Sequence, residues 1–247
     1  MGEVRGVFAK KDQVYRIISS TGKSAYGLYS NVRHPGVSHM NMPPADIPRN
    51  VPAHSIVTRD NVQFRVIDVP YRQITEVPEY QFGDIRPDDL VLDIGANIGA
   101  FCIRAVRLSP HVTAVEPVTT DLLEENVRLN HEEVRIIRGA LGTGMPTEIT
   151  WDECRRMSPT YTLGTLIRMA GGCDFLKCDC EGAEWLIQPR DLDGIKRIEM
   201  ELHIPPISGP PNPALLDYIG DHYRFSIDRS PVYSALGVMG ILHATRK

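Results

Sequence analysis

The residues of this chain best placed for chemistry are two carboxylates and two glycines around one turn. Asp93 lies near the end of an apolar stretch, Gly95 and Gly99 follow it, and Glu116 ends the next apolar stretch 21 residues after Gly95. Glycine lets the backbone take tight or positive-φ conformations and approach a ligand without an intervening Cβ. An acid at the end of the second stretch can accept hydrogen bonds from both hydroxyls of a ribose. The spacing therefore predicts a nucleotide pocket.

The turn residues favour one class of nucleotide. A dinucleotide site uses the pattern G-x-G-x-x-G/A so that the backbone can close on a pyrophosphate. Gly95, Asn97 and Ala100 fit that pattern only in part, and Asp93 would place negative charge beside an anion. S-adenosylmethionine has no phosphate, and carboxylates suit its ammonium and sulfonium groups. We therefore expect S-adenosylmethionine rather than NAD; a glycine-rich turn that binds nothing is the alternative.

Alternating strand and helix patterns must position these residues. Strands are expected from Val91 and at 112–115, 134–138, 174–178, 195–202, 224–228 and 238–244. An amphipathic helix is expected directly after the glycine turn, and further helices at 119–130, 162–170 and 214–220. The last two strands must pair antiparallel, because a parallel crossover needs about a dozen residues or more. This predicts a Rossmann-like α/β fold: a mostly parallel seven-stranded sheet with a terminal antiparallel hairpin, which is the class I methyltransferase architecture.

The expected cofactor contacts include the residues beside the glycine turn, beside Glu116 and in a loop at 139–142. They are Asp93, Gly95, Ala96, Asn97, Gly99, Glu116, Pro117, Ala140, Leu141 and Asp179.

Length and charge limit the remaining possibilities. The chain has 247 residues, enough for one α/β domain at 71–247 and a β-rich N-terminal arm or cap at 1–70, with short strands at 14–19, 55–58 and 63–66. A formal net charge of −4 gives no bulk attraction to nucleic acid or to an anionic membrane. No apolar run approaches the ~18 residues of a membrane span, and the first residues lack the apolar region of a signal peptide. We expect a cytoplasmic protein without a membrane partner.

The cysteines indicate neither a disulfide framework nor a metal site. Their number, five, is odd, and Cys173, Cys178 and Cys180 fall around one expected strand. Cys178 and Cys180 would share a face of that strand, as metal ligands could. We interpret them instead as small buried hydrophobic side chains, and we expect no metal-ligating residues in this chain.

One segment resembles a known family. The run D-F-L-K-C-D-C-E-G-A-E at 174–184, preceded by T-L-G-T-L at 162–166 and followed by E-M-E-L-H at 199–203, is similar to motifs of the FkbM-type methyltransferases. The resemblance covers the chain from about Glu76 to its end. It implies S-adenosylmethionine-dependent methylation, usually of an oxygen on a sugar or a small natural product. Gly164 departs from the family, which usually has aspartate there.

The same segment supplies the candidate catalytic residues. Parallel strands end at one edge of a sheet, so Asp179 and His203 should converge there with Asp93 and Glu116. We expect His203 to be the general base and Asp179 to orient the acceptor, with Glu181 and Lys177 beside them.

Each of these roles has a simpler alternative. His203 could be a strand-end histidine bonded to a backbone carbonyl, and Glu184 a carboxylate favoured at a helix N-terminus. Lys177 lies in an apolar strand and needs a carboxylate partner, for which Glu181, Glu184 and Glu201 are the candidates.

Two other functions stay open. The helix at 122–130 resembles one found in some transfer-RNA methyltransferases, although the acidic charge and the absence of an N-P-P-Y-type motif oppose an RNA acceptor. A cofactor-bound subunit without activity is the non-enzymatic alternative. The preferred acceptor is a small molecule or a glycan.

Overall fold

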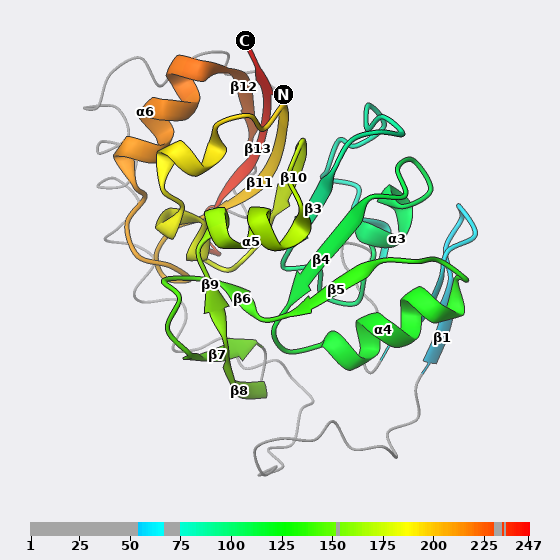
Figure 1. Cartoon of the computed structure of the whole chain (residues 1–247). Helices are drawn as coiled ribbons and strands as arrows, with labels where there is room; N and C mark the ends of the chain where they lie inside the picture. The colour runs from blue at the N-terminus through cyan, green and yellow to red at the C-terminus, as the bar shows by residue number, and fades with distance from the viewer. Residues whose placement is uncertain (1–53, 67–74, 152–153, 230–233, 235) are drawn as a thin grey trace.

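The computed structural model describes residues 54–66, 75–151, 154–229, 234 and 236–247, and their centre is a seven-stranded sheet (Figure 1). Its strands are β3 (Val91–Ile94), β4 (Val112–Glu116), β5 (Arg135–Arg138), β10 (Phe175–Cys178), β11 (Arg197–His203), β12 (Tyr223–Asp228) and β13 (Val238–Arg246). The order across the sheet is β12-β13-β11-β10-β3-β4-β5. Neighbouring strands from β11 to β5 pair parallel, whereas β13 pairs antiparallel with both β11 and β12. The expected mostly parallel sheet with a terminal antiparallel hairpin is therefore confirmed.

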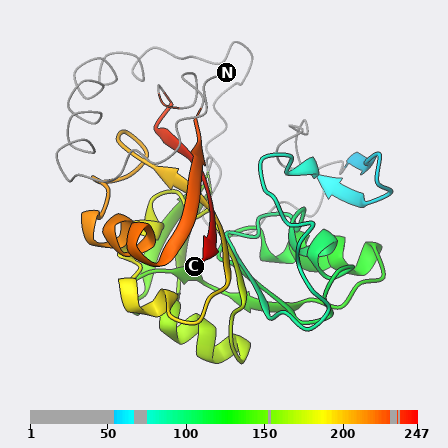
Figure 2. The ribbon, with the colours of Figure 1, turned by 90° about the horizontal axis from the view of Figure 1, so that it is seen from above.

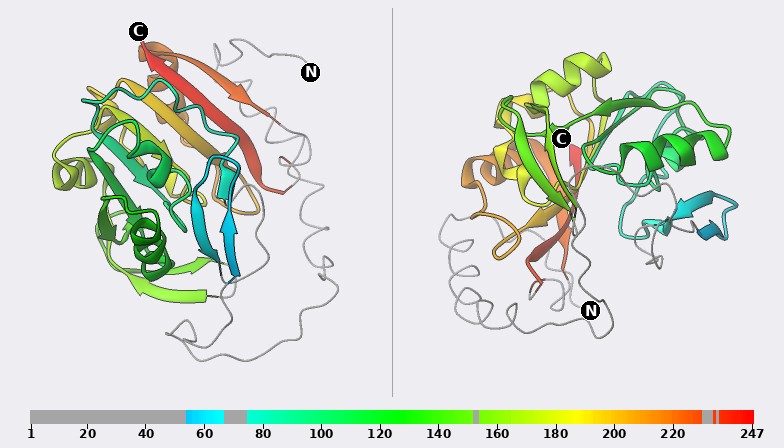
Figure 3. Two further views of the ribbon diagram at one scale, coloured as in Figure 1. Left: turned by 90° about the vertical axis from the view of Figure 1, so that its right-hand side faces the viewer. Right: turned by 90° about the horizontal axis from the view of Figure 1, so that it is seen from below.

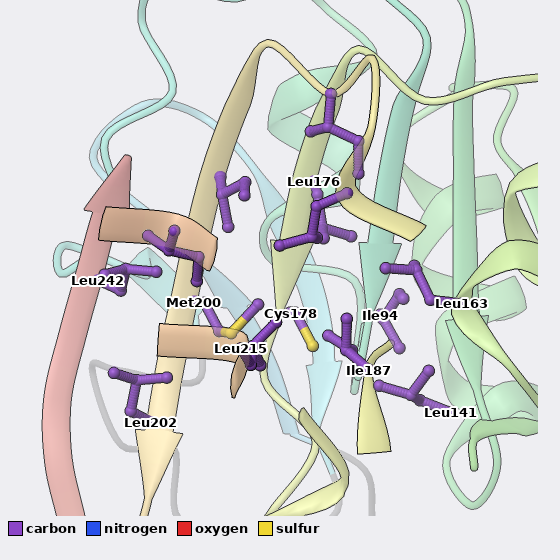
Figure 4. Close-up of a cluster of buried hydrophobic side chains, with 14 of the residues drawn as sticks. Ile94, Leu141, Leu163, Leu176, Cys178, Ile187, Met200, Leu202, Leu215 and Leu242 are labelled. Atoms are coloured by element: carbon purple, nitrogen blue, oxygen red, sulfur yellow. The ribbon is translucent and has the colours of Figure 1, made fainter. Parts of the chain in front are cut away.

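Helices cover both faces of the sheet. Figure 2 shows α5 (Leu163–Ala170) and α6 (Pro213–His222) on one side and α3 (Cys102–Ala105) and α4 (Thr120–Leu129) on the other. Alternate strand residues point to opposite faces, so each face has its own apolar cluster. Figure 4 shows the α5 and α6 side, where strand residues Ile94, Leu176 and Met200 pack with Leu163 and Leu215.

Helix α3 is shorter and more buried than the amphipathic helix that the sequence predicts. It spans Cys102–Ala105, and all of its residues are buried. Arg104, the polar residue of this turn, is covered because its guanidinium bonds the Asp60 carboxylate at 2.6 Å and the Thr75 carbonyl at 2.8 Å. The segments before the sheet thus cover a face that the sequence pattern assigned to solvent.

The hairpin of β1 (His54–Val57) and β2 (Gln63–Val66) lies beside α4 (Figure 3). The Asn130 amide accepts from the Gln63 N–H at 2.9 Å and donates to the Gln63 carbonyl at 2.6 Å. Asn126 makes the same pair of bonds to Arg65, at 2.7 Å and 3.2 Å. The strands expected at 55–58 and 63–66 are confirmed to within one residue; the strand expected at 14–19 lies outside the described residues.

Four short strands were not expected. Between β5 and α5, β6 (Ala140–Leu141) pairs parallel with β9 (Thr160–Tyr161), and β7 (Thr147–Trp151) pairs antiparallel with β8 (Cys154–Ser158). Of the residues in and beside this hairpin whose burial is described, Met145, Glu148, Arg156 and Met157 are exposed. Exposed strand residues of this kind leave no alternating hydrophobic pattern in the sequence.

The chain reverses its direction across the sheet between β3 and β10. From β3 it proceeds to β4 and β5, then returns to β10 and continues to β11 on the other side. In parallel α/β sheets, the crevice at the carboxyl ends of strands beside such a reversal is where ligands bind. No helix among the described residues is long and apolar enough to cross a membrane.

Candidate active site at the carboxyl ends of β3, β10 and β11

The glycine turn after β3 is in direct contact with the turn after β10. Gly95 has φ +74°, and a Cβ there would lie 1.7 Å from the Asp179 carbonyl oxygen. The Asp179 N–H in turn donates to the Ile94 carbonyl at 3.0 Å. Asn97 also has a positive φ, +49°, and Gly99 has +98°. Glycine is therefore required at position 95 for close approach, at the point where the strand order reverses.

Glu116 connects this turn to the start of α4. Its Oε2 accepts from the Asn97 N–H at 2.9 Å, and its Oε1 accepts from the N–H groups of Val118 and Thr119 at 2.7 Å and 2.9 Å. Thr119 occupies the N-cap position of α4, and its side chain makes no capping bond. A carboxylate offers about four acceptor positions, so capacity for a ribose hydroxyl remains.

The other expected cofactor residues fall into two groups. Ala96 is buried in the glycine turn, and Pro117 is half-buried directly after Glu116. Ala140 and Leu141 are buried in β6, and Leu141 packs in the apolar cluster on the α5 side. The expected loop at 139–142 therefore contains a short strand.

Lys177 has different partners from those expected. The parallel register of β3 and β10 places Lys177 beside Asp93, and its Nζ lies 3.2 Å from Asp93 Oδ1 and 3.9 Å from Asp179 Oδ2. It also donates to the Gly95 carbonyl at 2.8 Å. Lys177 does not pair with the partners proposed from sequence, which were Glu181, Glu184 and Glu201. The register of β10 against β3, and not proximity in the sequence, decides which side chain lies beside Lys177.

The Asp93–Lys177 pair is fully enclosed. The Asp93 side chain is 0% exposed and that of Lys177 is 5% exposed. Burial alone would lower the pKa of Lys177, but the charges of Asp93 and Asp179 raise it above its ordinary value. Lys177 therefore keeps its proton and forms the ion pair with Asp93, whose buried carboxylate oxygens make no hydrogen bond to the described residues.

His203 gathers the remaining candidate residues. Its ring is 1% exposed, and its Nε2 lies 3.4 Å from Glu181 Oε2 and 4.0 Å from Asp179 Oδ1. Burial alone would lower the pKa of His203, but its bond to Glu184 and the surrounding negative charges raise that pKa to about 9. The three residues that the sequence singled out converge, although a histidine that holds its proton at neutral pH is not the free base that was expected.

Glu184 orients His203. Its Oε1 accepts from the His203 backbone N–H at 2.7 Å and lies 3.1 Å from His203 Nδ1, while its Oε2 accepts from the Gly182 N–H at 2.9 Å. The Glu184 side chain is 0% exposed, within the 3₁₀ turn η2 (Ala183–Leu186). It therefore fixes the imidazole from behind, which the helix-terminus alternative does not account for.

Three further residues belong to this cluster, and two of them, Glu79 and Tyr80, were missed. Tyr80 donates its hydroxyl proton to Asp179 Oδ2 at 3.0 Å, and Glu79 adds a carboxyl with an unpartnered buried oxygen. Glu201 Oε2 lies 3.9 Å from His203 Nε2, and burial together with Asp179 raises the pKa of Glu201 to about 9. Glu201 was expected at this edge with His203, since residues two apart on a strand share a face, whereas no pattern marks 79–80.

Gly164, the departure from the FkbM pattern, also has a structural explanation. A Cβ at this position would lie 2.7 Å from Asp191 Oδ1. Asp191 belongs to the 3₁₀ turn η3 (Pro189–Leu192). The carboxylate of Asp191 thus lies next to the place where the family usually carries an aspartate.

A separate hollow lies at the opposite, amino-terminal edge of the sheet. It has a volume of about 710 Å³ and is lined by residues that include His111, Glu132 and Arg135. None of the candidate site residues lines it, so its size does not bear on the chemistry of the His203 cluster.

Comparisons with known proteins give short or distant matches. No family model matches the chain. It is 34% identical over 68 residues to the curated protein "Probable ribosomal RNA small subunit methyltransferase A" of Methanothermobacter thermautotrophicus, a match that covers 27% of this chain. The match spans 24% of the length of that relative.

Solved structures with a similar chain path include methyltransferases. TYW2 of M. jannaschii, in complex with AdoMet, has a TM-score of 0.48 at 14% identity, over 79% of this chain and 87% of that one. Precorrin-6y C5,15-methyltransferase of Geobacter metallireducens has a TM-score of 0.42 at 13% identity, over 66% and 82% of the two chains.

Proposed function

We propose that this chain is an S-adenosylmethionine-dependent methyltransferase. The observation that carries the proposal is the position of the glycine turn, Glu116 and the His203 cluster, which meet at the reversal between β3 and β10. A cofactor placed on Gly95 and Asn97 would have its ribose near Glu116. The Asp179 and His203 side chains would then lie on the acceptor side.

The proposed reaction needs an aligned acceptor and a route for its proton. The enzyme must hold the acceptor nucleophile, the methyl carbon and the sulfonium sulfur in line. In our proposal Asp179, which Tyr80 holds from one side, orients the acceptor hydroxyl. The carboxylates beside His203 stabilise the sulfonium charge and give the released proton nearby acceptors.

We propose a hydroxyl of a sugar or small natural product as the acceptor. The support is the similarity of residues 174–184 to the FkbM-type motif, together with the charge of the cluster. The carboxyls of Glu79, Asp179, Glu181 and Glu201 surround the acceptor side, and the ionised carboxylates among them repel phosphates. An RNA acceptor is the second candidate, because the partly matching curated relative is named as a ribosomal RNA methyltransferase.

Cofactor binding is tested by calorimetry with S-adenosylmethionine and S-adenosylhomocysteine. Glu116→Ala removes a charged acceptor and should weaken binding by about 1 to 3 kcal/mol. Glu124→Ala, on the exposed side of α4, is the matched control and should bind like the parent chain. Equal affinity of the Glu116 variant, or a preference for NAD, would contradict the proposal.

The acceptor is tested by transfer of a labelled methyl group. The chain is incubated with labelled S-adenosylmethionine and either a panel of sugars and small hydroxylated compounds or total RNA. Label in the first panel supports the preferred acceptor, and label in RNA alone supports the second candidate. Tight cofactor binding without transfer to either would favour a silent cofactor-binding subunit.

A further inference from the structure

We propose that Asp179, Glu181 and His203 form a binding site for a divalent transition-metal ion, with Glu201 at its edge. No metal ligand was expected from the sequence. The ligand atoms of Asp179, Glu181 and His203 all lie within 4.8 Å of one another. The binding site itself does not depend on the methyltransferase proposal, since it rests on the geometry of these side chains.

The spacing of the ligand atoms suits a shared ion. Metal–nitrogen and metal–oxygen bonds of about 2.1 Å place two tetrahedral ligands about 3.4 Å apart. The distance from His203 Nε2 is 3.4 Å to Glu181 Oε2, 3.9 Å to Glu201 Oε2 and 4.0 Å to Asp179 Oδ1. Side-chain movements of less than about an ångström would bring these three oxygens to the spacing from Nε2 that ligands of one ion have.

The imidazole is oriented as in a metal site. A metal-bound histidine almost always donates its second ring N–H to a carboxylate, a carbonyl or water, which fixes the ring and its tautomer. His203 Nδ1 faces Glu184 Oε1 at 3.1 Å, and this leaves Nε2 facing the other carboxylates. The ring is 1% exposed, so Nε2 is shielded from bulk solvent beside these carboxylates.

The two carboxylate ligands are also held by the fold. Asp179 is anchored by the contact of its backbone with Gly95, and its Oδ2 accepts from Tyr80. Glu181 has φ +51°, a left-handed conformation that is unusual outside glycine. Strained backbone of this kind persists where the surroundings enforce it, and it concentrates at functional sites. Here it directs the Glu181 carboxylate toward His203.

Glu181 and Glu201 have no lysine or arginine ion-pair partner among the described residues. Lys177 lies 3.9 Å from Asp179 but is engaged by Asp93 at 3.2 Å. One imidazole with two or three carboxylates is a mixed donor set that suits Mn²⁺ or Zn²⁺ better than Ca²⁺. With three protein ligands, the ion keeps open positions. If the proposed function holds, a hydroxyl bound there would lose its proton more readily.

The test is a titration of the chelator-treated full chain with MnCl₂, followed by electron paramagnetic resonance. We expect one bound ion per chain and a nitrogen coupling from His203 in the pulsed spectrum. His203→Gln should remove that coupling, and Asp179→Asn and Glu181→Gln should each weaken binding at least about tenfold. Glu184→Gln, which loosens the orientation of the ring, should weaken binding by about ten- to a hundredfold.

Controls separate this proposal from folding defects and from the methyltransferase proposal. His111→Gln, at an exposed histidine at the opposite edge of the sheet, should leave Mn²⁺ binding unchanged. Glu181 is 52% exposed, so Glu181→Gln should fold normally, as checked by circular dichroism. Absence of Mn²⁺ binding up to about 1 mM, or binding that the Glu181 and His203 variants leave intact, overturns the metal site. Calorimetry with S-adenosylmethionine alone reports separately on the cofactor.

Discussion

Replacement of Gly95 by alanine tests whether the contact between the β3 and β10 turns sets the site. Its Cβ would lie 1.7 Å from the Asp179 carbonyl oxygen, so the two turns must separate by 1.3 Å to reach the 3.0 Å below which such contacts are essentially never seen. Alanine at positive φ costs about 1 to 2 kcal/mol, and forced displacement in a packed region about 1 to 3 kcal/mol more. After the smaller entropy of the unfolded chain offsets part of this cost, the free energy of unfolding should fall by about 2 to 4 kcal/mol.

Gly171 provides a matched control. It has φ +88°, close to the +74° of Gly95, but a Cβ there would meet nothing within 4 Å. Gly171→Ala should cost only about 1 kcal/mol, because the smaller entropy of the unfolded chain offsets part of the backbone strain. In urea, with a slope of about 2.5 kcal/mol per molar, the midpoint should fall by about 0.4 M for Gly171→Ala and by about 0.8 to 1.6 M for Gly95→Ala.

The two variants should also differ in binding. A displaced Asp179 alters both the cofactor side and the metal side, so Gly95→Ala should weaken S-adenosylmethionine and Mn²⁺ binding, whereas Gly171→Ala should affect neither. Equal midpoints for the two variants would refute the reasoning. The glycine would then be required only for its backbone angle and not for close approach.

Two further predictions concern the covering of the sheet. Asn126 is 0% exposed, and Asn126→Ala removes the acceptor of the Arg65 N–H. This should lower the free energy of unfolding by about 1 to 3 kcal/mol, more than Asn130→Ala does at its more exposed position. Unchanged hydrogen-exchange protection of the Arg65 amide would contradict this. Burial lowers the pKa of His243, but Glu199 outweighs it and raises that pKa above 6.5. The stabilisation is therefore complete below about pH 6.5 and lost as pH rises through the folded-state pKa. Urea unfolding from pH 6 to 9 should show this loss, and the slope should be smaller in His243→Gln; an unchanged slope in that variant would count against it.

The sheet and its helices could be predicted because their burial leaves a periodic pattern. The stretches that became β3, β4 and β10 are mostly apolar and buried at every position, which is typical of parallel strands covered on both faces. Helix α5 begins after a capping Thr162 and ends at Gly171 with a left-handed C-cap. In contrast, α3 is covered by segments distant in sequence, and no local pattern reports such a cover.

The location of the candidate site could be predicted from the sequence, but which side chains contact one another there could be predicted less well. Strand ends place Asp179 and His203 at one edge, which a sequence pattern can indicate. Register decides that Lys177 faces Asp93, and register is a property of two strands rather than one. Tyr80 and Glu184 reach the site through a loop and a 3₁₀ turn, for which hydrophobic periodicity carries no information.

The asparagine pair on α4 has a geometric limit. Four residues along a helix advance about 6.0 Å, and two residues along a strand advance about 6.6 Å. The spacing of Asn126 and Asn130 along the helix therefore nearly matches that of Arg65 and Gln63 along the strand. The two side-chain amides bond the edge of β2 in place of the backbone of a neighbouring strand. The difference of about 0.6 Å between the two spacings adds up with each further pair of residues. Side-chain amides on a helix can therefore bond two positions of a strand edge in this way, but not a longer edge. Insertion of one residue between the two asparagines would turn one amide by about 100° and release the hairpin.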